Sequence, residues 1–201
     1  MLEELFAGDP GGDLLPTQFT EIAWEKGEVH RAIKRMKVQK SADECGLVAE
    51  ILKHVPDSFI DTLVGQFNDL MRTGQVPTDW RKTSFKMLPK TIRAKVPSEY
   101  RPIATIRLFY KLFAYMILGR VETQLETHQP EEQHGFRGGR RVEEHLVTTR
   151  LLLDKLSNTD VPIWVVSLDL SKAFDRVHWP ALWPALSKQG LSEHMIWMIQ
   201  N

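Results

Sequence analysis

Apolar residues recur every three or four positions through the first third of the chain, with charged residues between them. This spacing is typical of amphipathic helices. It predicts three of them, over residues 21–36, 47–54 and 58–73. Residues 7–18, rich in Gly and Pro, and the polar residues 37–46 are predicted to be loops. Gly74 follows the third stretch, at the position of a helix C-cap.

After Pro77 the pattern changes to a loose alternation of apolar and polar residues, which favours strands. Residues 83–88 and 100–106 are predicted to be short strands that form a hairpin around a basic loop. The longest helical pattern follows over residues 107–126, and a further helix is predicted over residues 142–156. The middle of the chain thus combines a hairpin with long helices.

The last part of the chain opens with a short apolar, β-branched run at residues 163–168, which predicts a buried strand. The run ends at Asp169, and a carboxylate at the end of a buried strand is costly unless it is paired or bound to a metal. Helical patterning returns afterwards, with a kink or a break expected at Pro184. Gly190 and Ser192 are placed as a helix stop and a new N-cap.

Composition excludes several classes of protein. The chain has 201 residues, 42% hydrophobic and 26% charged, which is ordinary for a soluble globular protein and unlike a disordered tail, a collagen or a coiled coil. No run of apolar residues is long enough to span a membrane, so no membrane partner is expected. The start of the chain lacks a secretory signal pattern. The single cysteine, Cys45, excludes an internal disulfide framework and favours a reducing, intracellular compartment.

The net charge of zero hides an uneven distribution. Residues 81–120 hold ten basic residues and one acidic residue, Glu99, so this block carries +9 and the remainder of the chain −9. A basic block on a neutral protein points to a local site for a polyanion, such as nucleic acid or a nucleoside triphosphate. A solvated basic face with no ligand is an equally good interpretation of charge alone.

The segment around Asp169 carries the strongest chemical signal. A strand that ends at Asp169 would deliver its carboxylate together with the next backbone carbonyl, that of Leu170. Mg²⁺ prefers such oxygen ligands and keeps water or substrate phosphates in its other positions. Phe174 would lie close to whatever the metal holds, and the basic block would supply charges that balance phosphates.

VSLDLSKAFDRVHW (166–179) resembles the first catalytic motif of reverse transcriptases, in the form found in non-LTR retrotransposons and group II introns. The upstream motifs follow in that family's order: LPK (88–90), YRPIATI (100–106), ILGR (117–120) and QHGFRGGR (133–140). The stretches KSADECGLVAEILKH (40–54) and FNDLMRTGQVPTDWRK (67–82) resemble the segment that precedes the fingers in non-LTR enzymes. One departure is Asp43-Glu44-Cys45-Gly46, where the family usually has Gly-Pro-Asp-Gly.

The resemblance implies an α+β chain with a right-hand polymerase fold, in which a helix-rich N-terminal segment and the fingers precede the first strand of the palm. Palm and thumb would be incomplete. The expected divisions are a flexible segment over 1–20, a helical extension over 21–80, fingers over 81–160 and the start of the palm over 161–201.

The resemblance also implies a role for each matching residue. Asp169 would be the first catalytic, metal-binding aspartate, and Leu170 would lend its backbone carbonyl to the second of two Mg²⁺ ions. Phe174 would select the sugar, and Lys90 and Arg101 would bind the triphosphate. Arg137 would lie where glycines let the backbone approach the template. The expected nucleic-acid contacts are Lys86, Arg93, Arg107, Lys111, Arg137 and Arg140.

One feature of the family is missing. Its other catalytic aspartates come from a later Tyr/Phe-x-Asp-Asp motif, and no Asp-Asp pair occurs in this sequence. The remaining palm and the thumb are expected beyond residue 201. The chain alone is therefore predicted to bind Mg²⁺ weakly or not at all and to be inactive, although it is part of a polymerase whose partners are an RNA template, a DNA primer and dNTP. The alternative is a non-catalytic RNA-binding remnant of a retroelement. Location in the nucleus or cytoplasm and the oligomeric state stay open.

Overall fold

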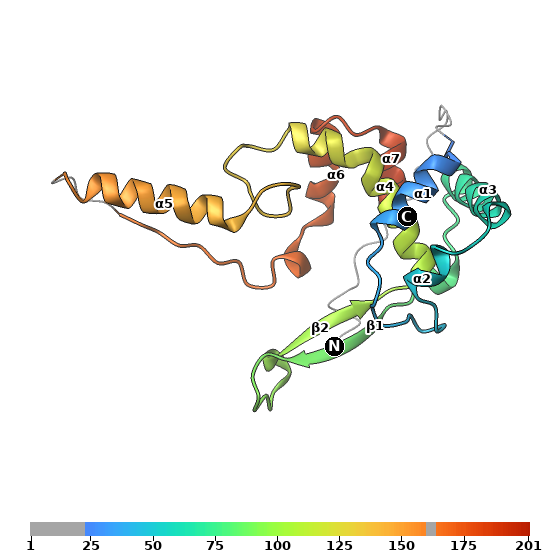
Figure 1. Cartoon of the computed structure of the whole chain (residues 1–201), viewed down its shortest axis with the longest axis horizontal. Coiled ribbons are helices and arrows are strands. Elements are labelled where there is room, and N and C mark those ends of the chain that lie inside the picture. Colours follow the sequence, from blue (N-terminus) through green and yellow to red (C-terminus); the bar gives the residue numbers. More distant parts are fainter. Residues whose placement is uncertain (1–22, 160–163) are drawn as a thin grey trace. The chain divides into compact units, whose positions relative to one another are not determined.

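The computed structural model of the chain describes residues 23–159 and 164–201 (Figure 1). These residues fall into two compact units. We call residues 23–122 and 191–201 the core unit, and residues 123–159 and 164–190 the motif unit. None of the helices in the described residues is both long enough and apolar enough to cross a membrane.

The core unit holds most of the regular structure. Its helices and strands are α1 (Lys26–Arg35), α2 (Ala49–Leu52), α3 (Asp57–Thr73), the short 3-10 helices η1 (Thr78–Arg81) and η2 (Pro97–Glu99), β1 (Ser84–Pro89), β2 (Tyr100–Thr105), the first part of α4 (Leu108–Thr127) and α7 (Glu193–Gln200). The predicted helices and the predicted hairpin strands are thus confirmed, with shifted ends. Residues 21 and 22 of the first predicted helix lie outside the described residues.

The ends of the helices follow from local hydrogen bonds. α1 begins at Lys26 because Glu25 and Glu28 form a capping box, in which the Glu25 N–H donates to the Glu28 carboxylate at 2.9 Å. α3 ends at Gly74, whose φ of 65° lets its N–H donate to the Leu70 carbonyl at 2.8 Å. This confirms the predicted C-cap. Ser192 caps α7 by accepting a hydrogen bond from the Met195 N–H, as the sequence predicts.

The hydrophobic core lies between α1, α3 and α4. Val29 and Ile33 of α1, Ile60 and Phe67 of α3, and Leu112 of α4 are almost completely buried. An aromatic cluster centres on Phe113, whose ring lies 6.0 Å from Trp24, 5.3 Å from Phe67 and 6.1 Å from Trp80, measured between ring centroids. Burial of these large side chains is the main source of stability in this unit.

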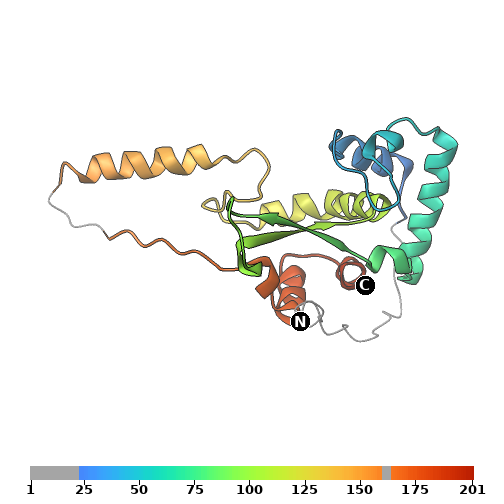
Figure 2. The ribbon, with the colours of Figure 1, turned by 90° about the horizontal axis from the view of Figure 1, so that it is seen from below.

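The strands β1 and β2 form an antiparallel hairpin, drawn as two green arrows in Figure 1 and seen from another direction in Figure 2. The ladder runs without interruption from the pair Ser84–Thr105 to the pair Pro89–Tyr100, and it pairs Lys86 with Ile103 and Leu88 with Arg101. The predicted hairpin is confirmed.

The motif unit contains the last turn of α4, α5 (Val142–Leu156), the short η3 (Phe174–Arg176) and α6 (Trp179–Lys188). α5 has the bounds that the sequence predicts. No residue of α5, η3 or α6 is buried. The sequence predicts a kink or a break at Pro184, but α6 continues through this residue, so the break is wrong. Proline removes one backbone N–H donor, and the remaining hydrogen bonds keep the helix continuous here. A kink stays a prediction.

The predicted buried strand at residues 163–168 is also wrong where the structure describes it. Residues 164–168 form no strand, and Trp164 and Leu168 are 91% and 87% exposed. A strand is stable only when a neighbouring strand pairs with its backbone N–H and C=O groups. The sheet in the described residues consists of β1 and β2, and neither pairs with residues 164–168. Residue 163 lies outside the described residues. Asp169 therefore does not stand at the end of a buried strand.

Candidate nucleic-acid interface

The hairpin sorts its side chains onto two faces, because residues that are paired across an antiparallel ladder point to the same side. Lys86 pairs with Ile103 and Leu88 with Arg101, so both cations share one face with two aliphatic residues. Lys86 and Arg101 are diagonal neighbours on that face, a separation that long side chains bridge. The opposite face is apolar and includes Phe85 and Met87, each close to half exposed.

The loop between the strands is an ordered structure that carries further cations. The Lys90 N–H donates to the Glu99 carbonyl at 2.7 Å, and the Lys90 Nζ donates to the Ser98 carbonyl at 2.7 Å. The Glu99 carboxylate accepts backbone hydrogen bonds from Lys95 at 2.6 Å and Val96 at 3.3 Å. The one acidic residue of the basic block thus supports the backbone of the loop.

The positive charge of the hairpin is not balanced locally. In the part of the chain that the structure describes, no carboxylate forms an ion pair with the hairpin cations Lys86, Lys90, Arg93, Lys95 and Arg101. All five are exposed. The hairpin therefore presents exposed cations without carboxylate partners on an ordered backbone, which suits phosphate groups.

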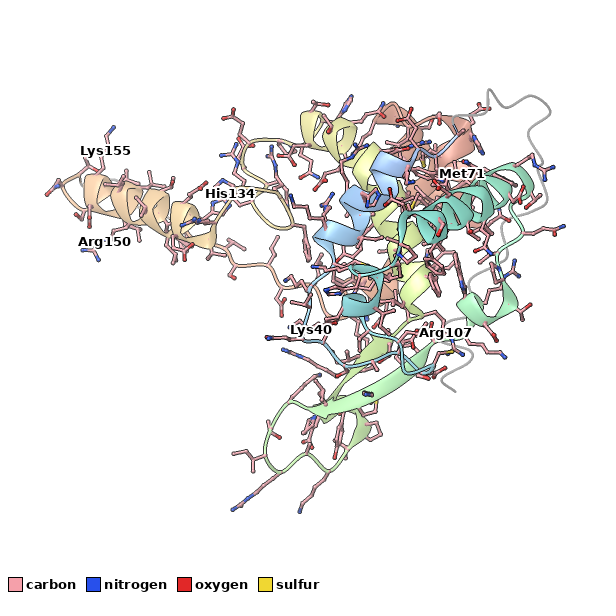
Figure 3. All side chains as sticks on the ribbon, turned by 45° about the vertical axis from the view of Figure 1, so that its right-hand side comes forward. Lys40, Met71, Arg107, His134, Arg150 and Lys155 are labelled. Carbon is pink, nitrogen blue, oxygen red and sulfur yellow. The ribbon has the colours of Figure 1, made fainter. Side chains whose placement is uncertain are left out.

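Arg107 differs from these cations, although the sequence places it in the same basic block. Its side chain is 17% exposed, and its Nη2 lies 3.3 Å from the Glu44 carboxylate. Its Nη1 donates to the Cys45 Sγ at 2.9 Å. In Figure 3 Arg107 lies where the hairpin passes into the helices. The guanidinium thus contacts the loop before α2, and Lys111, one turn further along α4, is only partly exposed.

Asp43 organises that same loop and was not identified from the sequence. Its Oδ1 accepts the N–H groups of Cys45 and Leu47 at 2.9 Å each, and its Oδ2 accepts the Leu108 N–H at 3.0 Å. Burial raises the pKa of the Asp43 carboxyl, but these three donors outweigh burial and hold the pKa below its ordinary value. Asp43 thereby links the loop of the unusual Asp-Glu-Cys-Gly sequence to the first turn of α4.

Arg137 is the best-anchored cation of the motif unit. Its side chain is 8% exposed, with Nε and Nη2 at 2.8 and 2.7 Å from the Glu126 carboxylate. Its Nη1 donates to the carbonyls of Pro130, at 2.7 Å, and Gln133, at 3.2 Å. These contacts fold residues 130–137 against the end of α4. Arg140 is more exposed, at 35%, and lies 3.8 Å from the Glu144 carboxylate.

The residues of the first catalytic motif are exposed. Leu170 and Phe174 are 77% and 75% exposed, and Asp169 is exposed as well. Phe174 meets Phe136 edge to face, with ring centroids 5.8 Å apart and planes at 85°. The segment 169–176 and the Gly-Arg loop 133–141 thus meet through two aromatic rings. Phe136 is the second residue that sequence reasoning missed, because neither its exposure nor its backbone conformation is visible in the sequence.

The described residues around Asp169 do not fit a two-metal Mg²⁺ site. Within the described residues, no cluster of three or more His, Cys, Asp or Glu side chains is arranged to hold a metal ion. One exposed carboxylate and one carbonyl do not displace the tightly held water of two Mg²⁺ ions. The described residues therefore do not form the two-metal site that the resemblance implies.

The expected site residues fall into two groups. Lys86, Lys90, Arg93, Arg101, Arg107 and Lys111 belong to the core unit, and Arg137, Arg140, Asp169, Leu170 and Phe174 belong to the motif unit. The structure brings Lys86 and Arg101 onto one face of the hairpin, and it brings Phe174 against Phe136, the neighbour of Arg137.

The described residues form a mixed α+β structure, with helices and one basic two-stranded hairpin. Residues 82–201 match the family model "Reverse transcriptase (RNA-dependent DNA polymerase)". Because this match covers more than half of the chain, the chain belongs to the reverse transcriptase family, in the form found in non-LTR retrotransposons. The family as a whole uses divalent metal ions and acts on nucleic-acid templates and dNTPs.

Its relatives include proteins of mobile elements. The RNA-directed DNA polymerase from mobile element jockey of Drosophila melanogaster is 29% identical over 161 residues, which are 77% of this chain and 17% of that protein. The type-1 retrotransposable element R2 Pol polyprotein of Popillia japonica is 29% identical over 83% of this chain and 22% of its own length. The transposon TX1 149 kDa protein of Xenopus laevis is 28% identical over 87% of this chain and 13% of its length. The chain thus spans about a fifth or less of these relatives.

Proposed function

We propose that the chain is the nucleic-acid-binding fingers portion of an RNA-directed DNA polymerase, followed by the first part of its palm. In this proposal residues 21–80 are a helical extension, residues 81–160 form the fingers of a right-hand fold, and residues 161–201 begin the palm. The observation that supports it best is the hairpin, which presents Lys86 and Arg101 on one face without acidic partners among the described residues.

The binding partners in this proposal are an RNA template, a DNA primer and dNTP. Lys90 and Arg101 bind phosphates of the nucleotide, because charge-assisted hydrogen bonds from Lys and Arg match phosphate oxygens. Lys86 and Arg93 contact the nucleic-acid backbone from the same hairpin. Phe174 contacts the sugar. Arg140 contacts the nucleic acid from the loop that precedes α5, and Arg137 holds that loop in place through Glu126. Lys111 extends the basic surface along α4, and Arg107, which is ion-paired with Glu44, positions the loop before α2 beside it.

Catalysis requires more carboxylates than the described residues bring together. Asp169, with the carbonyl of Leu170, contributes to a divalent-metal site only in a protein that supplies further aspartates. We therefore expect no incorporation of dNTP by this chain in a primer-extension assay with Mg²⁺. Incorporation above the level of an Asp169→Asn variant would contradict that expectation.

The binding proposal is tested with a fluorescent RNA–DNA duplex that carries a single-stranded template overhang. The affinity of the chain is measured by fluorescence anisotropy between 50 and 200 mM salt, a range over which each phosphate contact changes the affinity measurably. The variant Lys86→Ala/Arg101→Ala is expected to bind more weakly and to lower the slope of log K against log salt by about 2, or about 1 for each lost contact.

The matched control is Lys37→Ala/Lys40→Ala, which removes the same charge from exposed residues of the loop before α2. It is expected to leave the slope nearly unchanged. Equal effects of the two double variants would show that binding depends on total charge and not on the hairpin, and the proposal would then be abandoned. A non-catalytic RNA-binding remnant would give the same binding results. Primer extension distinguishes the two functions: a longer chain that includes the remaining motifs extends a primer if the protein is a polymerase and does not if it is a remnant.

A further inference from the structure

Phe136 is held in an unusual position on the loop between α4 and α5. Its φ is 63°, in the left-handed region, and its side chain is 96% exposed. An aromatic residue in this conformation is less stable than Gly or Asn would be. The loop has Gly135 before it and Gly138 and Gly139 after it, so the strained position is occupied by Phe in a segment that is otherwise rich in glycine.

The backbone that carries Phe136 is anchored on both sides. Toward α4, Arg137 holds the loop through Glu126 and the carbonyls of Pro130 and Gln133. Toward α5, the ring of His134, which is labelled in Figure 3, stacks on that of His145, with centroids 3.8 Å apart. The position of Phe136 therefore results from a braced loop, which presents the ring to solvent.

The ring of Phe136 does not stand alone. It meets Phe174 edge to face, and both rings keep most of their surface exposed. An edge-to-face pair leaves at least one face of a ring open to a third planar group. Lys172, two residues before Phe174, also has a left-handed φ, of 52°, so both loops present their side chains from constrained turns.

Cations surround this aromatic pair in the sequence of the two loops. Arg140 follows Phe136, and Lys172 and Arg176 flank Phe174, all of them at least partly exposed. A purely apolar partner would not benefit from such charges. Exposed aromatic rings combined with cations are instead the features by which proteins bind single-stranded nucleic acid, with bases stacked on the rings and phosphates near the cations.

We propose that Phe136, whose ring Phe174 meets edge to face, forms a stacking platform for an unpaired base of a single-stranded nucleic acid. This inference rests on the proposed function and adds a residue and a mode of contact to it. The hairpin binds backbone phosphates, whereas the platform binds a base. The two contributions differ in their response to salt, because stacking releases no condensed counterions.

The test measures binding of a fluorescein-labelled 12-nucleotide single-stranded RNA to the 201-residue chain. The central variant is Phe136→Gly, since Gly adopts the observed φ without strain and the loop backbone is preserved. Its affinity is expected to be about tenfold weaker, within the range for the loss of one base stacked on an aromatic ring. Its salt slope is expected to match that of the parent chain.

Three controls make the result specific. Phe136→Tyr retains a stacking ring and is expected to retain the affinity. Trp164→Ala removes another exposed aromatic residue of the motif unit, which is 91% exposed, and is expected to have little effect. An oligonucleotide with abasic sites is expected to bind the parent chain and Phe136→Gly equally.

The outcomes separate this inference from the proposed function. Unchanged affinity of Phe136→Gly, alongside a lowered salt slope for Lys86→Ala/Arg101→Ala, refutes the platform and leaves the hairpin interface in place. Failure of the parent chain to bind either RNA or the duplex refutes both. A thermal unfolding midpoint of Phe136→Gly well below that of the parent chain would assign Phe136 to packing and would also overturn the inference.

Discussion

Two ion pairs join α1 to α4 in the core unit, and their burial predicts very different contributions to stability. Glu28 accepts hydrogen bonds from the Nε and Nη2 of Arg120, each at 2.7 Å, and both side chains are 15% exposed. The Arg120 guanidinium also lies 3.6 Å from the ring centroid of Trp24. The second pair, Arg35 with Glu122, has distances of 2.7 and 3.0 Å, but its side chains are 40% and 47% exposed.

The perturbation is the removal of one carboxylate from each pair. Glu28→Ala leaves the Arg120 charge poorly hydrated and without this carboxylate, although the Arg120 Nη2 still donates to the Ala23 carbonyl. Loss of one member of a fully buried pair costs about 3 to 5 kcal/mol, and the lower limit, about 3 kcal/mol, applies to this mostly buried pair. Glu122→Ala breaks an exposed pair, which costs about 1 kcal/mol at most. With a denaturant slope of about 2 kcal/mol per M urea, the midpoints should fall by about 1.5 M and by no more than about 0.5 M.

Urea unfolding followed by far-UV circular dichroism measures both midpoints. A double-mutant cycle with Arg120→Met separates the interaction from the other contacts of each side chain. Equal shifts for Glu28→Ala and Glu122→Ala would refute the reasoning, because the two pairs share the same helices and the same chemistry and differ mainly in burial.

The pH dependence of the Glu28 pair has a definite sign. Burial raises the pKa of Glu28, but the hydrogen bonds from Arg120 and from the Glu25 N–H outweigh it, so the net pKa is lowered. A lowered pKa in the folded state contributes stability above the unfolded-state pKa of about 4.3. That contribution is lost as the pH falls through the folded-state value. The stability difference between the parent chain and Glu28→Gln should therefore shrink when the pH is lowered from 7 to below 4.

Three further predictions concern single residues. Gly74→Ala should lower the free energy of unfolding by more than about 2 kcal/mol, because φ is positive there and a Cβ collides with the Trp197 indole. Gly46 also has a positive φ but open space around it, so Gly46→Ala should cost about 1 kcal/mol when both variants are compared by chemical denaturation. Asp43→Ala should cost about 2 kcal/mol in the same assay by leaving backbone donors unpaired, and no loss would contradict its linking role. Arg137→Lys should speed hydrogen exchange in residues 130–137, because Lys does not reproduce the forked contacts; an unchanged exchange rate would argue against the anchor.

Local pattern was sufficient for the elements whose partners lie nearby in the sequence. α5 has its predicted bounds, α3 and α4 differ from theirs by one residue, and β1 pairs with β2 as the alternation indicated. Helical periodicity and Gly74 encode these elements within a few residues. The run at 163–168 has an equally clear pattern, yet residues 164–168 form no strand, because pairing depends on a neighbour that the pattern does not specify.

The candidate site was less predictable for the same reason. The sequence marks Arg101, Arg107 and Arg137 alike as cations in basic segments, whereas the structure leaves Arg101 exposed and places Arg107 and Arg137 against carboxylates. The partner of Arg107 lies 63 residues earlier, at Glu44, and no periodicity connects them. Charge counts therefore locate a basic region, and only the fold shows which of its cations are available to a ligand.

The two units divide packing and candidate chemistry between them. Buried residues concentrate on α1, α3, α4 and α7 of the core unit, whereas α5, η3 and α6 of the motif unit have none. α5 nevertheless carries Leu146, Leu151 and Leu152, each more than half exposed, and the apolar run after residue 163 is exposed as well. The apolar side of α5 and the apolar run after residue 163 are both typical of segments that pack against another surface, and within the described residues nothing covers them. Substitutions of buried residues in the core unit should therefore act mainly through stability, while those of the exposed Phe136 and Phe174 should act on binding with little effect on unfolding.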